Sequence, residues 1–102
     1  MRKITAAAVS AFYNGHPFAQ GNTRVDLHRD AVELVLHGTS IARLNLNSGR
    51  ISIRHAGWTT NTTKDRLNGI LDRIGGRIYQ KDFEWYLDGH RWEGGCSWTT
   101  VS

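Results

Sequence analysis

Apolar and polar residues alternate in four segments between residues 23 and 55, as they do in strands that bury one face. The segments are residues 23–28, 32–37, 41–47 and 50–55. The side chains expected to point inward are Val25, Leu27, Val32, Leu34, Leu36, Ala42, Leu44, Leu46, Ile51 and Ile53. Short turns containing glycine or asparagine separate the last three segments, so the pattern predicts an antiparallel meander with one buried face.

Two further segments have the periodicity of amphipathic helices. The first runs from about Lys3 to Tyr13, and Asn14-Gly15 ends it. Residues 60–63 offer threonine oxygens as N-caps for the second helix, and Gly75-Gly76 ends it. Its apolar residues are Leu67, Ile70, Leu71 and Ile74, at the spacing of one helical face.

The remaining segments complete a predicted α+β fold. Residues 16–22 are expected to form a loop, and residues 77–87 a hairpin with its tip near Lys81-Asp82. Residues 1–94 then form a single domain of order α-β-β-β-β-α-β-β, an antiparallel sheet of about four to six strands with both helices on one face. Residues 95–102 form either a tail or an edge strand. An unpaired edge strand could join two copies of the chain, so a homodimer is possible.

Charge is distributed unevenly along the 102 residues. The formal net charge is +4, and residues 1–60 contain seven Lys or Arg against three acids, whereas residues 61–102 contain six of each. A basic first part is typical of proteins that bind nucleic acid or an acidic protein. The single cysteine, Cys96, favours a reducing compartment. No segment approaches the ~18–20 apolar residues of a membrane span, so no membrane partner is expected.

Catalytic chemistry has little support in the sequence. The five histidines show no paired metal-ligand spacing, and Cys96 stands alone among glycines. Neither a nucleophile elbow nor a phosphate-binding loop is present. We therefore expect a protein without enzymatic activity, metal or cofactor.

Six arginines are candidates for binding a polyanion or an acidic partner. Arg24, Arg43, Arg50 and Arg54 are expected on the outward face of the sheet, where Asp26 and Glu33 offset part of their charge. This face either binds RNA, DNA or an acidic protein, or is the ordinary polar side of a half-buried sheet. No aromatic stacking platform is expected on it. Arg66 and Arg73 flank the apolar stripe of the second helix. They either contact phosphates, or lay their aliphatic stems on the core with their charged ends in solvent.

Aromatic residues cluster late in the chain. Trp58 and one of Trp85 and Tyr86 are expected in the core. Phe83 at the hairpin tip, with Trp92 and Trp98 in a glycine-rich segment, are harder to bury. If exposed, they are candidate anchors of a protein interface.

The order of several motifs resembles that of a known family. The segments "MRKIT", "LHG", "GWTTNTTKDRLNGIL" and "WYLDG" occur in the order and spacing of a family of short proteins of tailed bacteriophages. The resemblance covers most of residues 1–94, and the departures are the tip at residues 81–83 and the tail at residues 95–102. The family brings no established activity, so no functional residue is carried over. The resemblance implies a phage gene product that acts in the host bacterial cytoplasm.

Two main hypotheses of function follow, together with a weaker one. In the first, the chain is an accessory protein that binds and modulates a host protein, as an anti-CRISPR-like anti-defence protein or a host-takeover inhibitor does. In the second, the arginine-bearing face of the sheet binds nucleic acid with a strong dependence on salt. The weaker alternative is a minor virion or assembly role. Host-protein binding is favoured, because aromatic residues outnumber any organised phosphate-binding feature.

Overall fold

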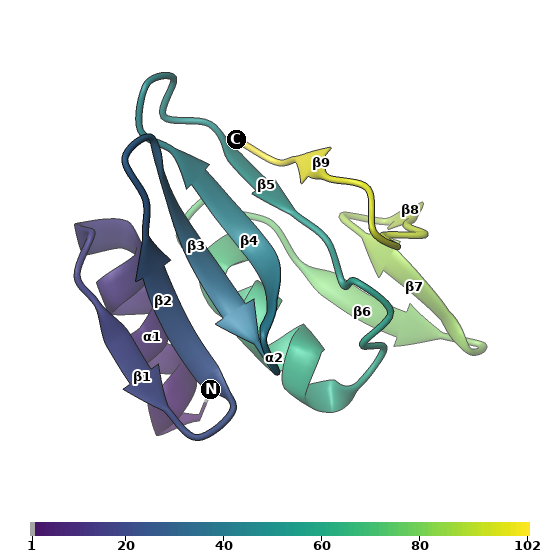
Figure 1. Ribbon diagram of the computed structural model, residues 1–102. Coiled ribbons are helices and arrows are strands. Elements are labelled where there is room, and N and C mark those ends of the chain that lie inside the picture. The colour runs from purple at the N-terminus through teal and green to yellow at the C-terminus, as the bar shows by residue number, and fades with distance from the viewer. Residues whose placement is uncertain (1) are drawn as a thin grey trace.

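The computed structural model describes residues 2–102 and has two helices and two antiparallel sheets (Figure 1). In chain order, the elements are α1 (Lys3–Asn14), β1 (Phe18–Gln20), β2 (Thr23–Leu27), β3 (Ala31–Leu36), β4 (Thr39–Asn45), β5 (Ile51–Ile53), α2 (Asn61–Leu71), β6 (Ile78–Lys81), β7 (Glu84–Leu87), β8 (His90–Arg91) and β9 (Thr99–Thr100). The large sheet has the order β1-β2-β3-β4-β5-β9, and the small sheet has the order β6-β7-β8. The predicted α+β class is confirmed.

Both helices lie behind the large sheet in Figure 1. Their apolar stripes and the inward face of the sheet form one core, in which Phe12 of α1, Leu34 of β3 and Leu67 of α2 are fully buried. The opposite face of the sheet has no helix over it. The alternation of the strands therefore leaves one polar face of the large sheet open.

The second helix begins where the sequence predicts but ends earlier. The Thr60 hydroxyl accepts a hydrogen bond from the Thr63 backbone N–H, which caps the start of α2. The helix ends at Leu71, whose carbonyl accepts the Gly76 N–H at 3.0 Å. Gly75 has a φ of +81°, a left-handed conformation that turns the chain away. Ile74, expected in the helix, follows its end instead.

The strands differ from the prediction at two places. Residues 18–20 form β1, where a loop was expected, because a strand of three residues is too short to show alternation. In β4, Leu34 pairs with Ala42 but Val35 pairs with Ser40, so Ile41 is the extra residue of a bulge. The bulge buries Ile41 next to Ala42, and β4 then ends at Asn45. Leu46, expected inward, is consequently 52% exposed.

The C-terminal strands are divided between the two sheets and do not form one continuous sheet with the meander. The terminal hairpin, β6 and β7, joins β8 in the small sheet. Residues 99–100 return to the large sheet as β9, where Thr99 pairs with Ile53 and Thr100 pairs with Ser52. The last segment is thus an edge strand of its own chain.

A buried arginine joins three elements. Arg66 of α2 is 2% exposed, and its guanidinium donates hydrogen bonds to the hydroxyls of Thr5 in α1 and Thr23 in β2. It also contacts the Asp65 carboxylate at 3.2 Å, and that carboxylate accepts a hydrogen bond from Thr5. Desolvation lowers the pKa of Arg66, against the raising effect of Asp65. This polar cluster fixes α1, α2 and β2 to one another.

Candidate functional site

The tip of the β6–β7 hairpin carries the most exposed aromatic side chain among residues 2–102. Asp82 and Phe83 form its two-residue turn, with φ angles of 52° and 66°. Two consecutive positive φ angles are typical of a type I′ turn, in which glycine is strongly preferred at the second position. Phe83 occupies that position and is 97% exposed. A bulky residue in the left-handed region that packs on nothing is an outlier that often marks function.

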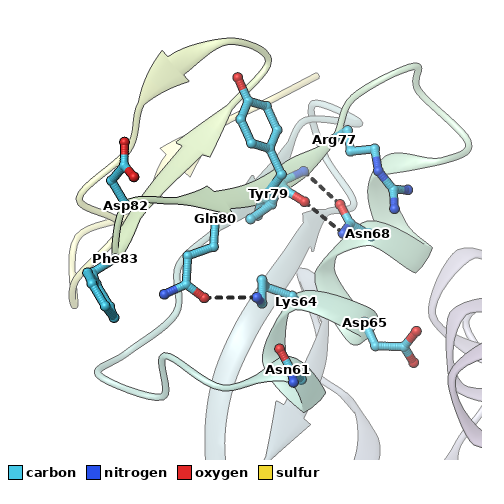
Figure 2. Close-up of a pocket in the computed structure, with 10 residues that line it drawn as sticks. Asn61, Lys64, Asp65, Asn68, Arg77, Tyr79, Gln80, Asp82 and Phe83 are labelled. Carbon is cyan, nitrogen blue, oxygen red and sulfur yellow. Dashed lines mark hydrogen bonds between the residues drawn. The ribbon is translucent and has the colours of Figure 1, made fainter.

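A groove of about 720 Å³ lies between α2 and β6 and reaches this tip. Its lining residues are Asn61, Lys64, Asp65, Asn68, Arg77, Ile78, Tyr79, Gln80, Asp82 and Phe83, and we call it the α2–β6 groove. Figure 2 shows Asp82 and Phe83 on the hairpin side of the groove and Lys64 and Asn68 on the α2 side. The groove is therefore lined by the hairpin on one side and by the helix on the other.

Side-chain hydrogen bonds fix the shape of this groove. The Asn68 amide donates to the Ile78 carbonyl at 2.9 Å and accepts the Ile78 N–H at 2.7 Å, so it pairs with β6 as another strand would (Figure 2). Across the groove, Lys64 Nζ donates to Gln80 Oε1 at 3.0 Å. These bonds hold β6, and with it the hairpin, at a set distance from α2.

The groove is polar and carries charges of both signs. Lys64 and Arg77 supply positive charge, and Asp65 and Asp82 supply negative charge. Lys64 Nζ also lies 5.7 Å from the ring of Trp85, which the core buries. A small-molecule site is usually enclosed and mostly apolar, so an open polar groove beside an exposed aromatic tip has the character of a protein-binding surface.

Trp92 and Trp58 differ from their expected places. Trp92, a predicted interface anchor, is 8% exposed and packs against Trp85 and His55. Its Nε1–H donates to the Thr99 hydroxyl at 2.9 Å, because the chain after Trp92 folds back over it. Trp58, predicted in the core, is 38% exposed and contacts the ring of His37. Trp85 lies in the core as expected.

Three of the six candidate arginines lie away from β4, β5 and β9 and contact other groups of the protein. Arg24 forms an ion pair with Asp26 at 2.9 Å, and this hydrogen bond raises the pKa of Arg24. Arg73 lies beyond the end of α2, with its guanidinium 4.7 Å from the centre of the Tyr13 ring. Arg66 corrects the prediction most clearly, because its charged end is buried rather than in solvent. Helical spacing predicts the direction in which Arg66 points from the helix axis. It does not predict that Thr5 and Thr23, far away in sequence, accept hydrogen bonds from it.

The other three arginines lie together on the open face of the large sheet, with a tryptophan beside them. Trp98 stacks on the guanidinium of Arg54 at 4.2 Å. It also lines a hollow of about 290 Å³ together with Arg43 and Arg50. An aromatic residue on this face contradicts the expectation that the sheet lacks a stacking platform. The pairing of β9 with β5 brings Trp98 there, and no local pattern in the sequence predicts that pairing.

The part of the chain that the structure describes holds neither a metal-binding group of side chains nor a membrane-spanning helix. Among residues 2–102, no three His, Cys, Asp or Glu side chains are grouped as a metal ion would require. None of the helices in this range is long and apolar enough to cross a membrane.

Comparison with known proteins places the chain beside a phage protein family. The sequence model of the Kyanoviridae Gp96 protein family matches residues 1–100 of the chain. No significant match was found among curated proteins or among solved structures. The match confirms the resemblance to a bacteriophage family that the sequence motifs indicated.

Proposed function

We propose that the chain, which belongs to the Kyanoviridae Gp96 family of phage proteins, binds and modulates a protein of the infected host. The binding surface is the hairpin tip, Asp82 and Phe83, together with the α2–β6 groove. The proposed place of action is the host bacterial cytoplasm, and the proposed role is that of an anti-defence or host-takeover inhibitor. The observation that carries the proposal is the fully exposed Phe83 in a left-handed turn.

Phe83 at this position lowers the stability of the isolated chain, so folding alone does not explain why it is there. A non-glycine residue in the left-handed region costs about 1–2 kcal/mol. Exposing a phenylalanine forgoes a further 1.5–3 kcal/mol, roughly, that burial of the side chain would contribute. A partner that covers Phe83 recovers the burial term, whereas the conformational cost of the turn stays the same in the complex. Aromatic residues, phenylalanine among them, are enriched at protein interfaces.

The groove supplies the polar surroundings that such an anchor needs. Interfaces combine a few buried aromatic residues with a rim of hydrogen-bonding and charged groups. Lys64, Gln80 and Arg77 provide such groups next to the tip. The negative charges of Asp65 and Asp82 balance the positive charges of Lys64 and Arg77, so the groove has no strong net charge. Specificity at this surface therefore comes from shape and from individual hydrogen bonds more than from attraction to a polyanion.

Site-specific photo-crosslinking in infected host cells tests the proposal. A photoreactive phenylalanine analogue is placed at position 83 and, in a matched control, at Leu46, which is also exposed but lies after β4. We expect one host protein to be crosslinked from position 83 and not from position 46, with nuclease treatment making no difference. Phe83→Ala in untagged competitor protein should weaken its ability to block the crosslink.

Three results would overturn the proposal. Equal crosslinking from positions 46 and 83 would mean that Phe83 has no special role. Crosslinks that disappear after nuclease would mean that the contact depends on nucleic acid. Full competition by the Phe83→Ala protein would mean that the aromatic ring contributes nothing to binding.

A further inference from the structure

The open face of the large sheet is electrostatically divided. On the side of β2 and β3, Arg24 pairs with Asp26, and His28 contacts Glu33 at 2.7 Å. On the side of β4, β5 and β9, Arg43, Arg50 and Arg54 form no ion pair with any acid among the residues that the structure describes. The positive charge of the face is therefore concentrated at one edge, which we call the basic face: Arg43, Arg50, Arg54 and Trp98.

Trp98 is held on this face by its surroundings. The β9 strand follows it immediately and pairs with β5 through Thr99 and Thr100. On one side of its ring lies the Arg54 guanidinium, which is itself fixed by hydrogen bonds to the carbonyls of Ser40 at 2.8 Å and Cys96 at 3.1 Å. Because Arg54 is bound to the backbone at two points, it orients the indole instead of moving freely in solvent. The tryptophan is thus positioned before any ligand arrives.

The hollow beside Trp98 offers groups for a nucleotide. Its lining residues are Arg43, Asn45, Ser48, Arg50, Ser52, Trp98 and Thr100. Its volume of about 290 Å³ lies near the lower end for small-ligand sites, about 300 Å³. Arginines bind phosphates, and the amide and hydroxyls can bond to base edges or sugars. The indole can stack on a base.

We propose that the basic face binds single-stranded nucleic acid, with a base stacked on Trp98 and the backbone phosphates on Arg43 and Arg50. This function is separate from the proposed protein binding, because the basic face and the α2–β6 groove share no residue. A single strand fits better than a duplex, because the bases of a duplex are stacked on each other and cannot reach an indole on a flat sheet. An acidic protein could satisfy the arginines but would leave the stacking position of Trp98 unused.

Fluorescence anisotropy tests the proposal with a labelled oligothymidine of about eight nucleotides, the RNA of the same length and the matching duplex. Titrations of the full chain at about 50 mM and about 200 mM NaCl give the salt dependence. We expect binding to both single strands, weaker binding to the duplex and a marked loss of affinity at the higher salt. Trp98→Ala should weaken binding about 5- to 150-fold, the loss of one base-stacking contact.

Charge variants separate the basic face from the rest of the molecule. Arg43→Gln with Arg50→Gln should lower the slope of log affinity against log salt by about 1.4, since each phosphate contact contributes about 0.7 for a single strand. Arg24→Gln, on the same sheet face but paired with Asp26, is the matched control and should change little. Phe83→Ala should leave oligonucleotide binding unchanged, so failure here is distinguishable from failure of the proposed protein-binding function.

Several outcomes would overturn the proposal. They are no binding at the lower salt, equal binding of duplex and single strand, and unchanged affinity in Trp98→Ala. Binding of polyglutamate in place of the oligonucleotides would identify the basic face as a site for an acidic protein. If Trp98→Ala unfolds, the variant with Arg43→Gln and Arg50→Gln tests the proposal instead. Both arginine side chains are exposed, so their replacement leaves the fold intact. An unchanged salt slope in that variant would contradict phosphate binding.

Discussion

Replacing Phe83 by glycine is expected to stabilise the protein while it weakens partner binding. The substitution creates an Asp-Gly pair at the β6–β7 turn, where both φ angles are positive. Asp-Gly is among the preferred sequences for a type I′ turn. Phe83 is 97% exposed, so its removal loses almost no packing in the folded chain.

The magnitude follows from two opposing terms. Relief of the left-handed conformation contributes about 1–2 kcal/mol. The greater freedom of glycine in the unfolded chain costs about 0.5–1 kcal/mol. The net gain in the free energy of unfolding is therefore between about 0 and 1.5 kcal/mol, which for a domain of this size raises Tm by up to roughly 12 °C.

Thermal unfolding followed by circular dichroism measures this shift, with Phe83→Ala as the control. Alanine removes the aromatic ring but keeps a Cβ in the left-handed region, so we expect its Tm to stay near that of the parent protein. Both variants should lose binding of the host partner to the same extent. A lower Tm in Phe83→Gly would refute the reasoning, because it would mean that the Phe83 ring packs on something in solution.

Three more predictions concern the framework of the fold. Arg66→Ala should lower the free energy of unfolding by at least about 2 kcal/mol, measured by urea denaturation, because the two buried hydroxyls lose their donor at about 1 kcal/mol or more each; a loss below about 1 kcal/mol, typical of a surface ion pair, would contradict this. Burial raises the pKa of Tyr13 above 10.0, so stability is retained below that pH and falls as the pH rises through the folded-state value. Tyr13→Phe should remove this alkaline loss in a pH series of Tm values, and persistence of the loss would assign it to another group. Asn68→Ala should cost about 1–3 kcal/mol and loosen β6, seen as faster amide exchange at Ile78, whereas unchanged exchange there would show that Asn68 does not hold the strand.

Sequence patterns predict the elements of this fold better than its contacts. The alternation in residues 23–55 and the helical spacing around Leu67 depend on local geometry, so they place the strands, the helices and most of the core correctly. Leu27, expected inward, is 47% exposed because it is the last residue of β2. The bulge at Ile41 breaks the alternation, and no turn residue or glycine signals it. The bulge turns Ile41 inward beside Ala42, which alternation alone does not predict, whereas Leu46 is exposed because β4 ends at Asn45.

The candidate sites depend on long-range pairing, which a pattern does not reveal. Phe83 was identified as hard to bury because the hairpin around it is local, and the structure places it in solvent. Trp92 and Trp98 are six residues apart in the same glycine-rich segment, yet one is buried and the other lies on the open sheet face. The return of β9 to β5 separates them, and that return depends on a strand of two residues.

The polar cluster around Arg66 also has a consequence for how the chain unfolds. Its hydrogen-bond partners lie 43 and 61 residues away in sequence, in elements formed from the first quarter of the chain. The guanidinium can leave water at low cost only when both hydroxyls and Asp65 are in place. If any one of α1, α2 and β2 opens, the Arg66 guanidinium loses hydrogen-bond partners, and the elements that stay folded are destabilised. The cluster couples the N-terminal helix to the middle of the chain, so the three elements should melt as one cooperative unit, with a common opening free energy in hydrogen exchange.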